Sequence, residues 1–258
     1  MLVLLPPSEG KAPPGRGRPV DLDALSRPEL REPRRRVLDA LVDLCADTER
    51  ARTVLGLSPG LSAEVARNAR LREAPAMPAA KLYTGVLYEA LDVASLPAPA
   101  KRLVQRWALV FSGLWGLLRL GDRIPPYRCP IGVTLPGVGP LGGHWRRELA
   151  PVVAGSGPIL DLRSSAYAAA WAPAGDLARR TVAVRVLHER DGTRSVVSHF
   201  NKATKGRLVR DLLNATADPA TPGELVDALT ALGHRVEVSA RGTARRPWQL
   251  DVVVTEIH

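Results

Sequence analysis

The sequence predicts a mixed α/β (α+β) fold, with a central sheet flanked by helices. Helical spacing of apolar residues dominates the first half of the chain, whereas short apolar runs typical of strands dominate the second half. The two kinds of segment do not alternate strictly, which argues against an ordinary doubly wound sheet. No linker, repeat or low-complexity block interrupts the 258 residues, so we expect one domain over 1–258, of unusual topology.

The first half is predicted to hold one strand followed by helices. Met1–Leu5 is a short apolar run ended by Pro6-Pro7, which predicts a buried strand, and 6–20 lacks periodicity and predicts a loop. Apolar spacing and capping signals predict helices over Pro28–Asp47, from an N-cap at Ser62 to Leu71, over Ala79–Leu91, and over Pro97–Leu109, which runs into the buried stretch Leu109–Ser112.

The second half is predicted to supply most of the strands. Arg190-Asp-Gly-Thr193 is a hairpin turn, because Asp-Gly tolerates positive φ. Strands are expected over Ile131–Leu135, Pro158–Leu162, Thr181–Glu189, Ser195–His199, Val236–Ser239 and Leu250–Thr255. Helices are expected over Trp145–Val153, from Ser164 or Ser165, over Lys202–Leu213 and over Glu224–Leu232.

Composition indicates an anionic partner and gives no sign of a membrane or a metal. The formal net charge is +10, and the basic excess is spread over both halves, so folding must assemble any binding face. Cys45 and Cys129 form no CxxC pair, and the histidines show no ligand spacing, so we expect neither metal nor cofactor. The longest apolar stretch, Ala108–Leu118, is too short for a membrane span, and Met1–Leu5 lacks the features of a signal peptide. The expected location is the cytoplasm.

Four strings carry candidate binding residues. Ser8 and Lys11 follow the first strand, where α/β proteins place ligand contacts. The alternative without a function is that they belong to a solvated loop. Further along, Gly113 and Gly116 allow close backbone approach. Arg119, Arg123 and Arg128 are candidates for phosphate contacts beside Tyr127, with Asp122 orienting one of them or simply pairing with Arg119 inside a packed turn.

The two remaining strings lie in the second half. Arg163 and Tyr167 follow a predicted strand and begin a helix. The string His199-Phe-Asn-Lys-Ala-Thr-Lys runs from a strand end into a helix and contributes His199, Asn201, Lys202 and Lys205, with Arg210 further on. Cations at a helix start oppose its dipole, which favours contact with an anion over a purely structural role. Leu135-Pro-Gly-Val-Gly-Pro140 is interpreted as a β-turn, since its flanks are poor helices.

An ordered set of motifs along almost the whole chain resembles the peroxide stress protein YaaA family. The chain departs from the family pattern in reading Arg119-Leu-Gly-Asp122 for Arg-Pro-Leu-Asp, and in having Trp115 where Tyr is commoner. The matching residues are the N-terminal strand with Lys11, Tyr83-Thr-Gly85, Ser112-Gly-Leu-Trp-Gly116, Leu118-Arg119, Asp122, Pro126-Tyr-Arg128, Gly132, Leu162, Tyr167, Ser198, Lys202, Gly206 and Arg210.

The resemblance implies a cytoplasmic DNA-binding protein of the oxidative stress response, linked to DNA repair or recombination. It further implies a positively charged cleft and a helix-hairpin-helix element, for which Ser112–Gly116 is the better candidate and the Pro-Gly-Val-Gly string the weaker one. Double-stranded or structured DNA is the expected partner, bound through its phosphates and largely independently of sequence.

Two other functions stay open. One is an enzyme acting on a small anionic substrate, with Lys11 or Lys202 as nucleophile or base if buried and Arg119 gripping a carboxylate or phosphate. The residues expected to form its pocket are Lys11, Tyr83, Ser112, Arg119, Asp122, Tyr127, Arg163, Tyr167 and Lys202. Convergence of these side chains on one concave pocket would favour the enzyme. A thiol sensor working through Cys129, which follows Arg128, is a third possibility.

The sequence also predicts how the site is built. Lys11, Arg119, Tyr127, Arg128 and Lys202 each follow a strand or a tight turn, and we expect them to share one basic cleft. Asp122 is expected to pair with Arg119 or Arg128 rather than with the ligand. An anion entering the cleft would relieve the remaining repulsion and stabilise the fold.

Overall fold

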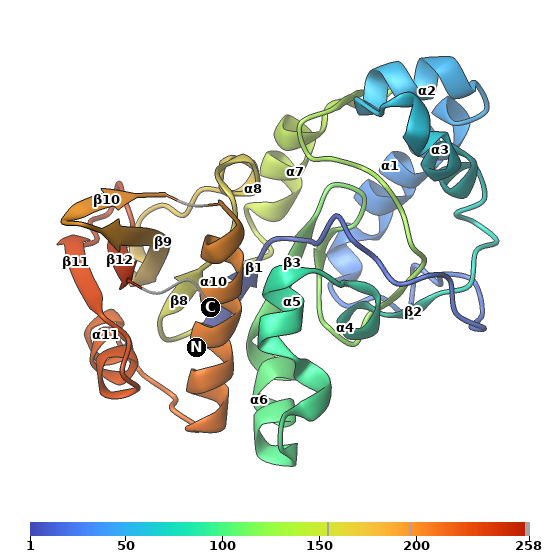
Figure 1. The fold of residues 1–258 in the computed structure, drawn as a ribbon. Coiled ribbons are helices and arrows are strands. Elements are labelled where there is room, and N and C mark those ends of the chain that lie inside the picture. The colour runs from blue at the N-terminus through green and yellow to red at the C-terminus, as the bar shows by residue number, and fades with distance from the viewer. Residues whose placement is uncertain (154, 197, 256–258) are drawn as a thin grey trace.

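A central sheet of eight strands organises the molecule (Figure 1). The computed structural model describes residues 1–153, 155–196 and 198–255, with the backbone alone at 198–200. The sheet order is β11-β12-β9-β8-β1-β3-β4, and β10 pairs with β9. Its strands are β1 (Leu2–Leu5), β3 (Ala108–Ser112), β4 (Gly116–Leu118), β8 (Ile159–Asp161), β9 (Thr181–Arg190), β10 (Thr193–Ser195), β11 (Val236–Ala240) and β12 (Trp248–Val254).

Short ribbons and helices complete the fold. Two-stranded ribbons are formed by β2 (Met77–Pro78) with β5 (Arg123–Ile124), and by β6 (Thr134–Leu135) with β7 (Gly139–Pro140). The helices are α1 (Arg31–Leu44), α2 (Thr48–Leu55), α3 (Ser62–Ala69), α4 (Ala79–Leu82), α5 (Val86–Leu91), α6 (Ala98–Trp107), α7 (Leu141–Leu149), α8 (Ser165–Ala170), α9 (Asp176–Arg180), α10 (Ser198–Asn214) and α11 (Pro222–Ala231), with 3-10 turns at Pro28–Leu30, Pro59–Leu61 and Val93–Ser95.

The five inner strands are parallel, and antiparallel strands close the edges. Strands β3, β1, β8, β9 and β12 are neighbours in that order, and each adjacent pair runs parallel. If these five strands are numbered by their order along the chain, their order across the sheet is 2-1-3-4-5. This is one of the two common strand orders of doubly wound sheets. The antiparallel strands β4, β11 and β10 interrupt the regular alternation of strands and helices along the chain, so the sequence pattern did not reveal this order. The expectation of a mixed α/β sheet is confirmed, with a more regular parallel centre than the sequence indicates.

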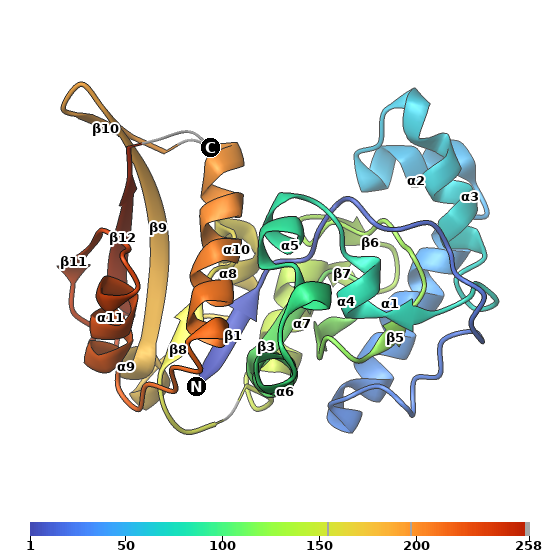
Figure 2. The same ribbon diagram turned by 60° about the horizontal axis from the view of Figure 1, so that its bottom comes forward.

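Buried apolar residues explain why the inner strands lie where they do. All four residues of β1 and all five of β3 are buried, as expected for strands covered on both faces. Helix α10 packs side by side with α5 and also contacts α6 and β9 (Figure 2). Helices α2 and α3 lie at the opposite end of the molecule from β10–β12 (Figures 1 and 2). Most of the buried hydrophobic residues form one cluster, which extends from Leu2 to Val252.

Several predicted boundaries were wrong for identifiable reasons. The predicted helix Ala79–Leu91 is two helices, because the chain turns at Tyr83–Gly85, where Gly85 has φ +99°. Ser62 begins α3 without capping it, and α7 begins at Leu141, before the predicted start at Trp145. The predicted strand Ser195–His199 ends at Ser195, and the chain is helical from Ser198, so Lys202 lies in the second helical turn; Val197 lies outside the described residues.

Both candidate strings for a helix-hairpin-helix element connect strands. Ser112–Gly116 joins β3 to β4 in an antiparallel hairpin, so this candidate is wrong. Leu135–Pro140 is the turn of the β6–β7 ribbon, in agreement with its interpretation as a β-turn. The Asp191-Gly192 turn between β9 and β10 also forms as predicted, with φ +49° and +74°.

None of the helices in the described part of the chain combines the length and the apolar character that crossing a membrane requires.

Candidate functional site

A cavity of about 620 Å³ lies at the carboxyl ends of β1 and β8. These neighbouring strands mark the point where the sheet order reverses, which is where open α/β sheets bind ligands. Three segments far apart in sequence form most of its wall: Pro6–Lys11 after β1, Leu162–Tyr167 after β8, and Asn201–Lys205 on α10. The remaining lining residues come from Gly85–Tyr88 and Tyr127–Gly132.

Lys11 is held in the wall of this cavity by pairing between two loops. The Lys11 segment forms an antiparallel bridge with Tyr83, and Thr84 N–H donates to Gly10 O (3.1 Å). The Ser8 hydroxyl donates to Thr84 O. The Lys11 amine donates to Ser8 O (2.9 Å) and lies 4.4 Å from the centre of the Tyr127 ring. Burial, followed by the charge of Arg128, lowers the pKa of Lys11 to about 8, although Glu64, Glu9 and Cys129 act in the opposite direction.

Three buried hydroxyls form a chain behind Lys11. Tyr127 Oη lies 2.8 Å from Tyr83 Oη and 2.6 Å from Ser112 Oγ, and Ser112 Oγ accepts from Trp115 N–H (3.0 Å). Three hydroxyl protons serve two hydroxyl–hydroxyl bonds, so one of the three protons is not used within the chain. Burial raises the pKa of Tyr83 and Tyr127 well above the usual value, which keeps both phenols protonated.

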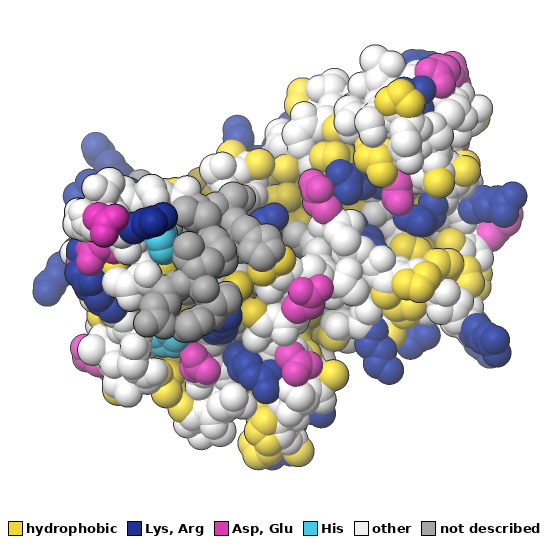
Figure 3. All heavy atoms as spheres, in the orientation of Figure 1, with side chains coloured by type: hydrophobic (Ala, Val, Ile, Leu, Met, Phe, Trp, Pro, Cys, Tyr) yellow, Lys and Arg dark blue, Asp and Glu magenta, His cyan; other side chains and the backbone are white. Residues whose placement is uncertain are grey.

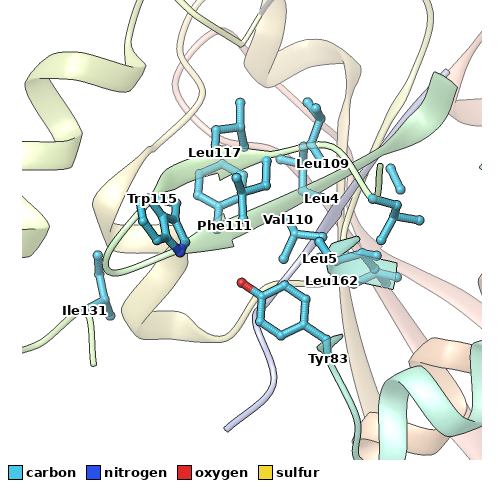
Figure 4. Packing of buried hydrophobic residues seen from close by; sticks show 14 of the residues in the cluster. Leu4, Leu5, Tyr83, Leu109, Val110, Phe111, Trp115, Leu117, Ile131 and Leu162 are labelled. Carbon is cyan, nitrogen blue, oxygen red and sulfur yellow. The ribbon is translucent and has the colours of Figure 1, made fainter. Parts of the chain in front are cut away.

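The hydroxyl chain rests directly on the hydrophobic core. Figure 4 shows Tyr83 beside Leu5 and Leu162, with its hydroxyl pointing into the cluster that contains Val110 and Trp115. A core packed to crystal-like density leaves these side chains few alternative positions. The polar wall of the cavity is therefore rigidly supported.

Helix α10 brings two lysines and an amide to the cavity. Lys202 is exposed, whereas Lys205 is buried and its amine donates to Leu162 O (3.2 Å). Burial lowers the pKa of Lys205, while the charge of Asp161 acts against this. Asn201 also lines the cavity, and its buried Oδ1 lacks a hydrogen-bond partner among the described residues. His199 belongs to α10 by its backbone, but its side chain lies outside the described residues.

Arg128 adds a fourth cation, with a carboxylate beside it. Its guanidinium lies 3.2 Å from Glu9, the one carboxylate among the described lining residues. The buried Asn68 clamps the backbone of residue 128 by accepting from its N–H (2.9 Å) and donating to its carbonyl (2.7 Å). Lys11, Arg128, Lys202 and Lys205 against Glu9 therefore make the described lining net positive. On the face shown in Figure 3, in contrast, Lys and Arg side chains are dispersed among acidic ones.

Arg119, Asp122 and Arg123 do not line this cavity, which corrects the expectation that Arg119 joins the site. Asp122 was expected to pair with a guanidinium. Instead its carboxylate accepts from the backbone N–H groups of Arg119 (2.8 Å) and Ser26 (2.9 Å) and from the Ser26 hydroxyl (2.5 Å). The Arg119 guanidinium donates to carbonyls at the end of α6, including that of Arg106, and Arg123 donates to Ala76 O (2.9 Å).

Arg163 and Arg210 are engaged in structural contacts. Arg163 is buried and makes a two-bond fork with Asp161 (2.9 and 2.6 Å), and its guanidinium also contacts the rings of Phe111 and Trp171. Arg210 donates to Leu91 O and Asp92 O (both 3.0 Å), which ties α10 to the end of α5. With the further bonds from Arg163 to Tyr167 O and from Arg210 to Ser95 Oγ, each guanidinium makes three of its five possible hydrogen bonds within the protein, which reduces its capacity for a ligand.

The two glycines of the β3–β4 turn serve close packing. A Cβ on Gly113 would lie 2.2 Å from Cys129 O, and a Cβ on Gly116, where φ is +69°, would meet the Trp145 ring. Gly113 thereby lets the β3–β4 turn approach the cavity segment Tyr127–Gly132. Tyr167, half-buried on α8, completes the wall on the β8 side.

The thiols do not have the character of a redox sensor. Burial raises the pKa of Cys45 to about 11 and that of Cys129 to about 12, the opposite of an activated thiolate. Within 1–153, 155–196 and 198–255, no group of three or more His, Cys, Asp or Glu side chains is placed to share a metal ion.

Four residues of the site escaped the sequence analysis. Glu9 and Thr84 lie inside strings that were singled out, but long-range pairing of the two loops gives them their roles. Tyr88 lines the cavity and donates to Pro6 O (2.7 Å), and Asn68 fixes Arg128 from α3. A polar residue on the buried face of a helix, as Asn68 is, was the one available signal.

Most or all of this chain is similar in sequence to known proteins. A family model described as peroxide stress protein YaaA matches residues 1–238. An UPF0246 protein of Streptomyces coelicolor is 60% identical over 262 residues, covering 100% of both chains. An UPF0246 protein of Corynebacterium efficiens is 41% identical over 93% of this chain and 96% of its own, and one of Cereibacter sphaeroides is 32% identical over 85% and 89%.

Proposed function

The chain belongs to the peroxide stress protein YaaA family, and we propose that it acts in the peroxide stress response by binding DNA. Contacts to the phosphate backbone carry this binding, so it is largely independent of sequence and serves DNA repair or recombination in the cytoplasm. The observation that supports it is the convergence of Lys11, Arg128, Lys202 and Lys205 on one cavity at the switch point of the sheet.

The charge balance of the cavity favours a phosphate. The one described carboxylate of the lining, Glu9, is already engaged by Arg128, which leaves three lysines facing the same space. A phosphate group relieves their mutual repulsion and receives charge-assisted hydrogen bonds. Lys202 is exposed and Arg128 is half-buried, so these two are placed at the rim, where a backbone too large for the cavity makes contact.

Removing the two rim cations tests DNA binding. In the double variant Lys202→Ala/Arg128→Gln we expect weaker binding to every duplex alike, and a salt slope smaller by about 2, because each lost phosphate contact removes roughly one released counterion. Fluorescence anisotropy from 50 to 200 mM salt measures both quantities. Lys101→Ala/Arg102→Ala removes two exposed cations from α6, outside the cavity lining, and is the matched control. Equal slopes in wild type and Lys202→Ala/Arg128→Gln would contradict the proposal.

The size and the lining of the cavity favour a second candidate function, catalysis on a small anionic substrate. Its volume falls in the 300–1,000 Å³ typical of small-molecule sites, and aromatic and apolar walls surround the amines. Of the nine residues expected in such a pocket, Lys11, Tyr127, Tyr167 and Lys202 line the cavity, and Tyr83 and Ser112 bond to Tyr127 behind it. Arg119, Asp122 and Arg163 do not line it, so the expected convergence is partial. The four that do line it are the observation that favours an enzyme pocket.

Anion-dependent melting tests whether the cavity takes a small anion. Phosphate or sulfate at about 100 times its Kd adds about 2.7 kcal/mol of stability, which raises Tm by roughly 5–10 °C in a chain of this size. The shift should disappear in Lys205→Met and persist in Arg123→Gln, whose guanidinium is bound to Ala76 O outside the cavity. The second candidate fails if no anion shifts the wild-type Tm at low salt.

A further inference from the structure

We propose that Lys11 forms a covalent imine with an aldehyde that carries a phosphate group, inside the cavity at the ends of β1 and β8. The geometry points to this chemistry because one amine is desolvated and restrained in the wall, while Lys202 and Lys205 face the same space from α10. For its phosphate requirement the inference rests on the proposed function, which it deepens by naming the substrate class.

The Lys11 amine is positioned as a nucleophile rather than as a structural cation. Its hydrogen bonds go to backbone carbonyls, those of Ser8 (2.9 Å) and Glu9 (3.5 Å), and none of the ion pairs among the described residues includes it. The nearest carboxylates are otherwise occupied, since Glu9 lies against Arg128 and Glu64 against Arg67. The antiparallel bridge to Tyr83 and the Tyr127 ring at 4.4 Å restrict where the side chain can move.

Burial also supplies the free base that attack on a carbonyl needs. With a pKa of about 8, close to half of the Lys11 side chains are uncharged at pH 8. An ordinary lysine, with a pKa near 10.4, is uncharged in roughly one molecule in 250 at that pH. Arg128, Glu64, Glu9 and Cys129 are the charged and titratable groups that act on the amine, and desolvation outweighs all of them. A lysine desolvated beside another cation is a recognised way to activate an amine.

The cations around the cavity decide which aldehydes bind. Lys205, held by Leu162 O below the cavity, and the exposed Lys202 at its rim are available for a phosphate on the same ligand. Tying the aldehyde to this anion site raises its effective concentration at Lys11. A neutral aldehyde lacks that anchor and should react far less.

The reaction balances without an oxidant or a reductant. The Lys11 nitrogen attacks the aldehyde carbon, forming the C–N bond as the carbonyl electron pair moves to oxygen. A proton passes from nitrogen to that oxygen, giving a carbinolamine. The nitrogen lone pair then forms the C=N double bond as the C–O bond breaks. The departing hydroxyl takes the second proton of the nitrogen, so that the products are a neutral imine and one water molecule. Tyr127, kept protonated by burial and bonded to Tyr83 and Ser112, fixes the wall against which this exchange takes place.

Two sources carry an aldehyde beside phosphate: the opened sugar of an abasic site in DNA, and a small aldehyde phosphate. The probes are a duplex with one abasic site and pyridoxal 5′-phosphate, each trapped by sodium borohydride, which reduces an imine to a stable amine. Peptide mass spectrometry then locates the adduct among the five lysines of the chain, of which Lys81 and Lys101 are exposed internal references. Lys11→Arg keeps the positive charge and cannot form an imine, so it is the matched variant.

With at least one probe we expect labelling at Lys11 to exceed that at Lys81 or Lys101 by tenfold or more at pH 8. The rate at Lys11 should level off above a midpoint near pH 8, whereas the rates at the reference lysines should keep rising toward pH 10. Lys11→Arg should lose the preferred adduct, and omitting the phosphate, with pyridoxal as probe, should lower the rate at Lys11 at least tenfold. Labelling confined to Lys202 or Lys205, equal labelling of all lysines, or full trapping in Lys11→Arg overturns the proposal.

The outcomes separate this inference from the proposed function. Anisotropy of an intact duplex, measured on the same preparations, reports DNA binding without any aldehyde. Trapping of pyridoxal 5′-phosphate at Lys11 without duplex binding supports the imine and contradicts DNA binding. Duplex binding without preferred labelling of Lys11 by either probe contradicts the imine and leaves DNA binding supported.

Discussion

Replacing Arg34 by methionine should destabilise the protein by about 3 kcal/mol, because two buried carbonyls and one half-buried carbonyl lose their donor. Arg34 lies on α1 and is fully buried. Its guanidinium donates to Trp115 O (3.0 Å), Leu117 O (2.6 Å) and Arg27 O (3.2 Å). Each orphaned carbonyl costs about 1–3 kcal/mol, and release of a desolvated charge offsets part of the sum. Burial lowers the pKa of Arg34 to about 10, although the charges of Asp122 and Glu29 act in the opposite direction.

The expected fall in Tm for Arg34→Met is about 6–12 °C for a chain of this size, measured by thermal unfolding. Arg36→Met alters an exposed residue of the same helix and should leave Tm within about 2 °C. Arg34→Lys keeps a charge but lacks the planar guanidinium, so its Tm should fall almost as far as that of Arg34→Met. If Arg34→Met had the same Tm as Arg36→Met, the contacts to Trp115 O and Leu117 O would have no part in holding the β3–β4 hairpin.

The elements that the sequence predicted well carry unambiguous local patterns. Strands β1 and β3 are continuous apolar runs, and α11 carries the capping pair Thr221 and Glu224, which bond each other at its start. Helix α2 (Thr48–Leu55) was not predicted, because it is short and buries only Ala51 and Leu55. The start of α7 was not predicted, because Gly142-Gly143 is unfavourable in a helix and indicated that the helix begins later.

The sequence predicted the site residues that directly follow parallel strands. It missed those whose position depends on contacts between loops that are distant in sequence. Lys11 and Tyr167 follow β1 and β8, and the rule that ligands bind at the carboxyl ends of parallel strands brings such residues together. Arg119 follows the antiparallel strand β4, to which that rule does not apply, and its guanidinium reaches the end of α6 instead. The pairing of the Lys11 loop with Tyr83–Gly85 depends on tertiary contacts that no local period encodes.

Two effects that oppose each other meet at Gly206, in the middle of α10. Glycine costs a helix about 1 kcal/mol relative to alanine, so propensity alone predicts that Gly206→Ala stabilises the protein. The packing predicts the reverse. A Cβ at this position would lie 2.3 Å from Leu87 O and 2.9 Å from the Ala90 side chain, both on α5. Backbone atoms cannot move aside as a flexible side chain can, so α10 and α5 must separate.

We therefore expect Gly206→Ala to lower the stability by about 2–3 kcal/mol and Tm by roughly 4–12 °C. Lys202 and Lys205 line the cavity from α10 and Gly85–Tyr88 line it from the α5 side, so the same separation should also weaken any phosphate-dependent rise in Tm. Gly143→Ala in α7 is the matched control, because a Cβ there would meet only the far end of the Arg147 side chain, at 4.0 Å. This variant should gain up to about 1 kcal/mol in stability. Thermal unfolding with and without phosphate measures both effects. A Gly206→Ala protein as stable as Gly143→Ala would show that α10 and α5 do not need this close contact.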